Sequence, residues 1–313
     1  MKKKAFTIVS DYDGLELKGV MYLPDGKTKG IVQITHGMNE YKERYEDFMR
    51  FLSGNGYVAA CYDQRGHGDS VKSEDDLGYF GDKKAQAIVD DAVQVTQYLK
   101  QEFPSVPLIL FGHSMGSMVV RCYLQQHDTL IDKLIVCGSP SKNPLAGCAV
   151  ALTKLITLFC GERHRSKFLS YVSTGKGDKK FKGEGKGAWL SRNKKSVEKF
   201  YANPKSRRKF TCNGFENLFR LMKNTYTKRR YQVRNKYLPI LFISGDKDAV
   251  IGNAYKWQQS MDVLVEVGYQ DVAGKLYPDF RHEILGEIGC KTVYKDVMSF
   301  LARPQSFEGK TDL

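Results

Sequence analysis

The stretch Pro107-Leu-Ile-Leu-Phe-Gly-His-Ser-Met-Gly116 contains the pattern that decides the fold. Its first half is an uninterrupted apolar run, which is typical of a parallel strand buried on both faces. Its second half, Gly112 to Gly116, matches G-x-S-x-G, and helical spacing follows. Because a strand, a glycine turn and a helix follow one another directly, we predict a strained turn that holds the Ser114 hydroxyl exposed.

Strand and helix patterns alternate on both sides of this turn. Strands are predicted at residues 6–9, 15–23, 30–35, 57–62, 107–111, 133–137, 239–243 and 275–277. Helices are predicted near 45–52, around 88–99, after 116, near 253–267 and at 292–301. This alternation predicts the α/β fold class, with a mostly parallel central sheet covered by helices on both faces.

The alternation breaks between Ser141 and Lys236, and the charge changes there too. This segment holds 25 Lys and Arg against 5 Asp and Glu, a net charge of +20, whereas the whole 313-residue chain carries +14. The rest of the chain is therefore at −6. We predict a core made of residues 1–140 and 237–313, interrupted by a basic insertion at 141–236.

Composition excludes several classes of protein. Hydrophobic residues make up 42% of the chain, so a packed core is available and disorder throughout is excluded. Seven cysteines without a CxxC pair argue against a disulfide framework and a zinc site. The apolar stretch after Met1-Lys-Lys-Lys4 is too short for a signal peptide, and no run approaches the ~20 apolar residues of a membrane span. We expect a cytoplasmic protein, with peripheral contact to a membrane left open.

A serine hydroxyl needs a base to take its proton and an acid to orient that base. The strand at 240–243 ends in Ser244-Gly-Asp-Lys-Asp248, which offers two carboxylates, Asp246 and Asp248. His282 follows in a later loop, so the order serine, acid, histidine is kept. The backbone amides of Met38 and Met115 are the candidates for an oxyanion hole.

Five motifs together resemble the monoacylglycerol lipase and lysophospholipase group of α/β-hydrolases, within the S33 serine aminopeptidase-like family. They are His36-Gly-Met-Asn-Glu40, Asp63-Gln-Arg-Gly-His-Gly-Asp-Ser70, Gly112-His-Ser-Met-Gly116, Gly245-Asp-Lys-Asp248 and Arg281-His-Glu283. The likeness covers the chain from about residue 10 to 302 and is looser across the insertion.

The resemblance implies an α/β-hydrolase fold in which residues 141–236 form a helical cap over the acyl site. It implies Ser114 as nucleophile, His282 as base and the Met38 and Met115 amides as oxyanion hole, and its Gly-x-x-Asp pattern selects Asp248 over Asp246. It also implies ester hydrolysis without a metal or organic cofactor. A hydrophobic helix opens the family's caps, and the segment 145–160 resembles it. The chain departs from the family where Ala188 replaces a usual Asp, and segment 203–209 is unusually basic.

Other readings of single motifs are weaker. The pair Asp246 and Asp248 lacks the twelve-residue loop of a calcium site, and Gly286 replaces the second histidine that a zinc motif beginning at His282 requires. Arg65 is expected in a structural ion pair within the loop 63–70. His36, His67 and His113 are expected to be hydrogen-bonded structural residues. The Gly-rich segment 175–187 is interpreted as a flexible loop rather than a phosphate site, and the stripe Phe215, Leu218, Phe219 and Met222 as cap packing, with an acyl tunnel as the alternative.

These patterns predict a serine ester hydrolase acting on a small acyl ester or lipid, either a monoacylglycerol or a lysophospholipid. A short-chain carboxylesterase or an aminopeptidase of the same fold is the enzymatic alternative, and a lipid-binding or membrane-docking protein is the non-enzymatic one. The basic insertion is either a solvated surface or a surface that docks to an anionic membrane. Nucleic acid is not an expected partner because no binding module is present. The oligomeric state, acyl length and head group stay open.

Overall fold

The computed structural model describes residues 1–82, 85–174 and 177–304. Its centre is an eight-stranded sheet with the order β1-β2-β4-β3-β5-β6-β7-β8. In chain order the strands are β1 (Lys2–Val9), β2 (Glu16–Leu23), β3 (Gly30–Thr35), β4 (Tyr57–Tyr62), β5 (Leu108–His113), β6 (Lys133–Cys137), β7 (Ile240–Gly245) and β8 (Val272–Tyr277). β2 is antiparallel to both its neighbours, and all the other pairings are parallel. The predicted α/β fold with a mostly parallel sheet is confirmed.

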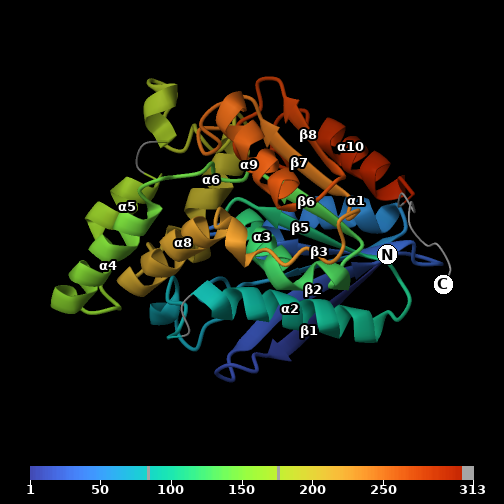
Figure 1. Cartoon of the computed structure of the whole chain (residues 1–313), viewed down its shortest axis with the longest axis horizontal. Coiled ribbons are helices and arrows are strands. Elements are labelled where there is room, and N and C mark those ends of the chain that lie inside the picture. Colours follow the sequence, from blue (N-terminus) through green and yellow to red (C-terminus); the bar gives the residue numbers. More distant parts are fainter. Residues whose placement is uncertain (83–84, 175–176, 305–313) are drawn as a thin grey trace.

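Helices cover both faces of this sheet, which separates the core into two layers (Figure 1). Side chains alternate along β5, so that Leu108 and Leu110 belong to one layer and Ile109 and Phe111 to the other. The first layer contains α2 (Ala85–Glu102), α3 (Met115–His127) and α9 (Ala254–Val267), and the second contains α1 (Glu46–Gly54) and α10 (Lys291–Ala302). Because β5 is central and buried on both sides, its end is a rigid platform for the turn that follows.

The segment 141–236 leaves the sheet between β6 and β7 and is helical. Its helices are α4 (Ala146–Cys160), α5 (Lys167–Thr174), α6 (Lys194–Ala202), α7 (Pro204–Arg207) and α8 (Cys212–Thr225), with 3₁₀ turns η4 (Gly177–Phe181) and η5 (Lys228–Arg230). Figure 1 shows α4 and α5 at one end of the molecule, and α8 contacts both α4 and α3. Residues 175–176 of the predicted Gly-rich loop lie outside the described residues.

The helical stripe on α8 packs into the core. Phe215, Leu218 and Phe219 are buried in the layer that contains α3, and Met222 is partly buried against it. The stripe therefore anchors the insertion, as its packing interpretation predicts. Within the residues that the structure describes, no helix has the length and apolar character needed to cross a bilayer.

Arg65 forms a structural ion pair, but its partners lie outside the loop in which they were predicted. Its guanidinium contacts Asp91 of α2 at 2.6 Å and Asp13 of the β1–β2 turn at 2.9 Å. The carboxylate of its own loop, Asp63, instead faces the Lys42 amine at 2.7 Å. The predicted ion pair is present, but the prediction of a partner within the loop 63–70 was wrong, because Asp63 is already paired with Lys42.

Candidate active site

The turn between β5 and α3 places Ser114 at the end of a central strand. Ser114 has φ 52° and ψ −115°, a conformation that side-chain-bearing residues rarely adopt and that the surrounding structure must enforce. A Cβ at Gly116 would lie 2.0 Å from the Thr35 carbonyl oxygen, and one at Gly112 would lie 2.5 Å from the Gly116 carbonyl oxygen. Both glycines are therefore required for α3 to pack this closely against the sheet.

The structure brings Ser114, His282 and Asp248 together. Ser114 Oγ lies 2.8 Å from His282 Nε2, and His282 Nδ1 lies 2.9 Å from Asp248 Oδ2. The three residues follow β5, β8 and β7, whose carboxyl ends meet at one edge of the parallel sheet. Because the Asp248 carboxylate only accepts hydrogen bonds, Nδ1 carries the proton and Nε2 is free to accept one from the serine.

Of the two candidate acids, Asp248 is the one in contact with His282. Asp248 is fully buried, and it also accepts hydrogen bonds from Ser244 Oγ at 3.0 Å and the Val250 amide at 2.7 Å. Asp246 turns away and accepts a hydrogen bond from the Asp279 amide at 2.7 Å. Asp246 therefore stabilises the turn between β8 and the His282 loop, while Asp248 is held in contact with the imidazole.

The two predicted oxyanion-hole residues lie on segments that contact Ser114. A Cβ at Gly37 would lie 3.1 Å from Ser114 Cβ, so the loop that carries Met38 passes directly against the serine. Met115 opens α3, and amides in the first helical turn have no acceptor within the helix. A helix N-terminus also favours negative charge. The placement is compatible with an oxyanion hole at these two amides, which stays a prediction.

His282 is enclosed by three further groups that the sequence did not single out for this role. Gly138, which follows β6, has φ 55°, and a Cβ there would lie 3.3 Å from the His282 ring, so both the backbone and the tight contact favour glycine. The His113 ring lies 4.8 Å away, and the Trp189 ring lies 5.2 Å away, between centroids. Trp189 comes from the 141–236 insertion, which thus takes part in enclosing the imidazole.

The insertion also supports the backbone of the His282 loop. The His282 amide donates to the Trp189 carbonyl at 3.4 Å, and the Glu283 amide donates to the Leu190 carbonyl at 2.7 Å. Arg281 donates to the Ala188 carbonyl at 2.6 Å and forms an ion pair with Glu184 at 2.5 Å. Ala188 is the position where the chain departs from the pattern of the family that it resembles. Here the Ala188 carbonyl accepts a hydrogen bond from Arg281, and Glu184 supplies a carboxylate.

His36 and His67 are hydrogen-bonded structural residues, as predicted. His36 Nε2 accepts from the Gln64 amide at 3.0 Å, and its Nδ1 lies 2.8 Å from the Gly37 carbonyl oxygen. Burial lowers the pKa of His36, and it lowers the pKa of His67 to about 3. Burial therefore favours the neutral form of both rings, and the hydrogen bond that His36 Nε2 accepts requires a neutral ring.

Among the described residues, one group of carboxylates has the spacing of a metal site: Glu43, Asp63 and Asp69. The Lys42 amine lies among these carboxylates, at 3.0, 2.7 and 2.5 Å respectively. These acids raise the pKa of Lys42 in spite of the opposing effect of its burial. The lysine ammonium therefore occupies the place of a cation, and this cluster gives no support to a metal cofactor.

The sheet order, with its serine turn after β5 and an insertion after β6, defines the α/β-hydrolase class. A family model described as "Serine aminopeptidase, S33" matches residues 26–289, and the chain belongs to this family. It is therefore a hydrolase.

Named relatives and solved structures agree with this assignment. The chain is 24% identical over 288 residues to the monoacylglycerol lipase of Mycolicibacterium smegmatis, covering 92% of this chain and 93% of the relative. It is 24% identical over 291 residues to the monoglyceride lipase of Mus musculus, covering 88% and 86%. The structure of a thermostable carboxyl esterase from Bacillus coagulans superposes with a TM-score of 0.86 at 25% identity, covering 96% of this chain and 98% of the other.

Proposed function

We propose that this chain is a serine ester hydrolase that cleaves a monoacyl lipid, a monoacylglycerol or a lysophospholipid, through an acyl-enzyme on Ser114. The observation that carries the proposal is the relay of 2.8 and 2.9 Å from Ser114 through His282 to Asp248, at a strained backbone turn where Ser114 is partly buried rather than fully exposed as the sequence predicted. The likeness to proteins named monoacylglycerol lipase supports the substrate class.

In the acylation step, His282 Nε2 takes the hydroxyl proton as Ser114 Oγ attacks the ester carbonyl carbon. The carbonyl oxygen becomes an oxyanion, which the amides of Met38 and Met115 would stabilise by hydrogen bonds. Asp248 stabilises the imidazolium formed at His282. The carbon–oxygen bond to the alcohol then breaks, His282 donates its proton to the leaving alcohol, and the acyl group stays on Ser114.

In the deacylation step, a water molecule takes the place of the alcohol. His282 Nε2 removes a proton from this water as its oxygen attacks the acyl carbon, and a second oxyanion forms at the same amides. The bond to Ser114 Oγ breaks, the serine recovers a proton from His282, and the fatty acid leaves. No step requires an electron acceptor or a metal-bound water.

The proposal is tested with a fluorophosphonate probe and a hydrolysis panel. We expect the probe to label the wild type and a Ser299→Ala control, whose serine is exposed on α10, but not Ser114→Ala. We expect the highest kcat/KM on a monoacylglycerol or a lysophospholipid. An unlabelled wild type would refute the mechanism and favour the lipid-binding alternative.

A short-chain carboxylesterase is the second candidate, because the esterase from Bacillus coagulans has a TM-score of 0.86. An aminopeptidase is a third, because the family carries that name. A series of p-nitrophenyl esters of increasing chain length, measured beside monoglycerides and aminoacyl amides, separates the three. A preference for acetyl esters would favour the esterase, and faster turnover of aminoacyl amides would refute the lipase.

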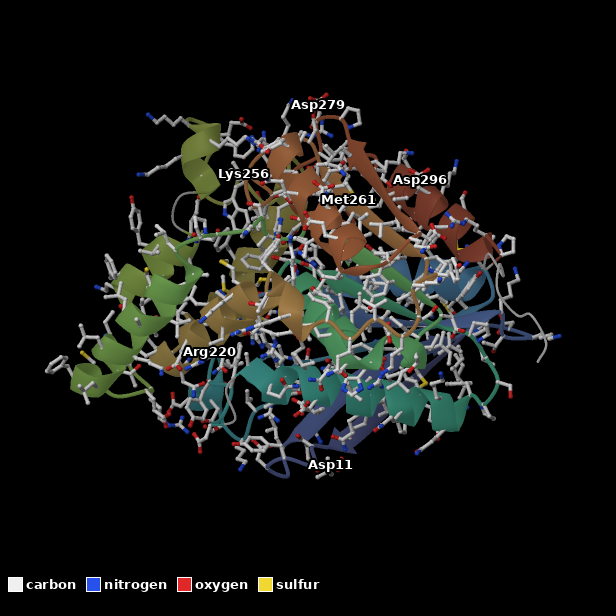
Figure 2. All side chains as sticks on the ribbon, in the orientation of Figure 1. Asp11, Arg220, Lys256, Met261, Asp279 and Asp296 are labelled. Atoms are coloured by element: carbon white, nitrogen blue, oxygen red, sulfur yellow. The ribbon has the colours of Figure 1, made fainter. Side chains whose placement is uncertain are left out.

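We further propose that residues 141–236 form a cap over the acyl site, and that α4 and α5 dock it to an anionic membrane. The two helices and the residue before α4 carry large apolar side chains that are exposed: Leu145, Leu152, Leu155, Leu158, Phe159, Phe168, Tyr171 and Val172. Figure 2 shows side chains of both helices projecting from the same end of the molecule. Leu152, Leu155 and Phe159 are spaced three and four residues apart, so they share one face of α4, and an exposed apolar face of this kind marks interaction sites in soluble proteins.

Charge favours an anionic lipid surface over another protein as the partner of these helices. Lys154 lies on α4 and Lys167 opens α5. Arg163 and Arg165, in the turn between these helices, already contact the loop after β4, so the preference for an anionic surface rests on the two lysines. Basic residues near an anionic bilayer contribute about 1 kcal/mol each, and neighbouring apolar side chains add the insertion energy. We expect flotation with anionic vesicles that weakens as salt rises. Equal binding to neutral and anionic vesicles would refute the charge argument.

A further inference from the structure

His113, the second residue of the serine motif, is buried next to the catalytic histidine. Its Nδ1 lies 3.4 Å from Glu40 Oε2, and its Nε2 lies 3.3 Å from the backbone carbonyl oxygen of His282. A carbonyl oxygen and an ionised carboxylate can only accept hydrogen bonds. Both ring nitrogens of His113 must therefore donate, and only the charged imidazolium form does so.

The Glu40 carboxylate is built to remain ionised. It accepts hydrogen bonds from the Gly37 amide and the Tyr45 hydroxyl, both at 2.6 Å, and Arg44 Nε lies 3.6 Å away. Burial by itself would raise the pKa of Glu40, but His113, Arg44 and the Tyr45 hydrogen bond outweigh it, and the pKa lies well below its usual value. With these donors the buried Glu40 carboxylate stays ionised and can balance a positive charge on His113.

His113 behaves oppositely to the other buried histidines near the site. Burial lowers the pKa of His36 and His67, and no carboxylate accepts a hydrogen bond from their rings. Burial also acts to lower the pKa of His113, but the charge and hydrogen bond of Glu40 raise it above its usual value. The hydrogen-bonding geometry and the electrostatics of His113 thus point in the same direction.

We propose that His113 is a buried imidazolium, held by Glu40, which fixes the His282 backbone and places a positive charge beside the catalytic ring. The centroids of the two imidazole rings are 4.8 Å apart. His113 is thus a positioning residue rather than a catalytic one. The assignment of charge stands on the structure alone, whereas its effect on turnover rests on the proposed hydrolase function.

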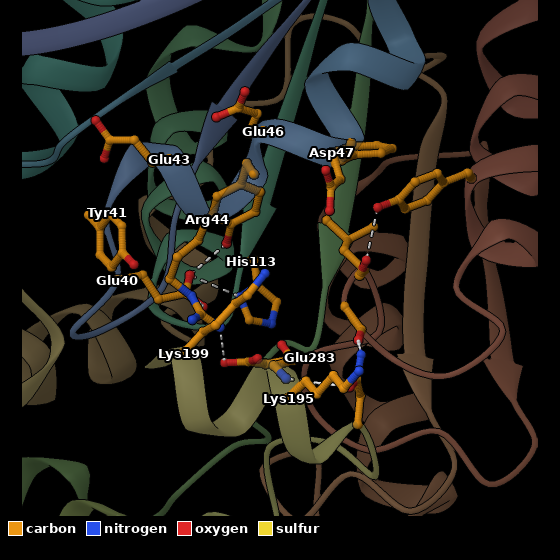
Figure 3. A pocket seen from close by; sticks show the side chains of 17 residues that line it. Glu40, Tyr41, Glu43, Arg44, Glu46, Asp47, His113, Lys195, Lys199 and Glu283 are labelled. Atoms are coloured by element: carbon orange, nitrogen blue, oxygen red, sulfur yellow. Dashed lines mark hydrogen bonds and ion pairs between the residues drawn. The ribbon is translucent and has the colours of Figure 1, made fainter. Parts of the chain in front are cut away.

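Charged groups from several elements face this pair across a polar cleft of about 490 Å³, which Figure 3 shows. Besides His113, its titratable lining includes Glu40, Tyr41, Glu43, Arg44, Tyr45, Glu46, Asp47, Lys195, Lys199, Glu283 and Tyr294. Arg44 Nη2 contacts Glu283 Oε1 at 2.6 Å, so these two charges largely compensate each other. His113 lines this cleft, which gives its ring access to solvent protons, and Ser114 does not line it.

A positive charge 4.8 Å from His282 opposes the protonation of the base. In His113→Gln, the amide can still donate to the His282 carbonyl, but the charge is gone. We expect the pH at which kcat/KM is half-maximal to move upward by about one unit, since unit charges at this distance interact appreciably even in a well-screened site. Glu40→Gln should move it in the same direction, because His113 loses its counter-ion and its proton. The control is His127→Gln. His127 lies at the far end of α3, the helix that begins after Ser114, so this change should leave the half-maximal pH unaltered.

A direct measurement does not depend on turnover. In the wild type labelled with ¹⁵N-histidine at pH 7, we expect both ring nitrogens of His113, assigned by their loss in His113→Gln, to show imidazolium shifts. A neutral ring would overturn the proposal even if the chain hydrolyses lipids. An imidazolium in a protein without hydrolase activity would refute the proposed function and leave this charge assignment intact. Unchanged half-maximal pH in both variants would refute the electrostatic effect on His282.

Discussion

Two neighbouring side chains at the end of α4 allow a quantitative test of membrane docking. Leu158 and Phe159 are 76% and 79% exposed, more than any other large apolar residue that the structure describes. Their transfer from water into a bilayer interface is worth about 1.5–3 kcal/mol each when complete. Allowing for partial insertion, we expect Leu158→Ser combined with Phe159→Ser to weaken binding by about 3 kcal/mol, which is about a hundredfold fall in the vesicle partition coefficient.

The assay is co-sedimentation with anionic vesicles at increasing lipid concentration, accompanied by fluorophosphonate labelling in the absence of lipid. Labelling should be unchanged, because neither side chain packs in the core. Val265→Ser on α9 is the matched control, since Val265 is 54% exposed but lies outside the insertion. If the double variant binds vesicles like the wild type, or if the control loses as much binding, the reasoning is refuted.

Three further changes test the fold and the charge assignments. Gly116→Ala should slow fluorophosphonate labelling of Ser114 about a hundredfold, because its Cβ would lie 2.0 Å from the Thr35 carbonyl and displace the serine; Gly147→Ala, with open space around it, should label normally. Arg65→Met should lower the unfolding free energy in urea by about 3–5 kcal/mol, because it strands the buried Asp91 carboxylate, and adding Asp91→Leu should restore much of it. Because the pKa of Glu40 is lowered, this carboxylate stabilises the folded state at pH values above its usual pKa of 4.5. Because the pKa of His113 is raised, this ring stabilises the folded state fully below its usual pKa of 6.5, and the contribution is lost as the pH rises further. The destabilisation by Glu40→Gln, measured by urea unfolding, should therefore be larger near pH 6 than near pH 9, and a pH-independent difference would contradict the pair.

The sequence predicted the parts of the site that depend on local patterns and chain order. Ser114, Asp248 and His282 each follow a strand pattern, and a parallel sheet gathers the carboxyl ends of its strands at one edge. The strained turn was predictable for the same reason, because only a glycine at 116 allows α3 to approach β3. Element types and order could thus be predicted where apolar periodicity was regular.

Contacts between residues far apart in sequence could not be predicted in the same way. Glu40 and His113 are separated by 73 positions, so neither residue's neighbours reveal that the histidine is charged. The partner of Arg65 on α2 and the contact of Trp189 with His282 were missed for the same reason. The apolar run of α4 was predicted as a helix, but its exposure was not, because a buried helix and a surface-docking helix have similar composition.

The fold also explains where part of the insertion's positive charge is used. Arg163 contacts Asp76 at 2.6 Å, Lys205 contacts Asp69 at 2.6 Å and Arg208 contacts Asp75 at 3.2 Å. All three acids lie in the acidic loop that follows β4, so the +20 insertion is partly neutralised by the −6 core. Such solvent-exposed pairs contribute little to stability and are screened by salt.

The buried side chains of α8, by contrast, hold the insertion by apolar packing, which salt does not weaken. Membrane docking and attachment of the insertion should therefore respond differently to ionic strength. At about 0.5 M NaCl, where the screening length is only ~4 Å, we expect vesicle binding to fall sharply while the rate of Ser114 labelling stays near its low-salt value. A parallel loss of both would mean that the ion pairs to the acidic loop, rather than α8, keep the insertion in contact with the His282 loop.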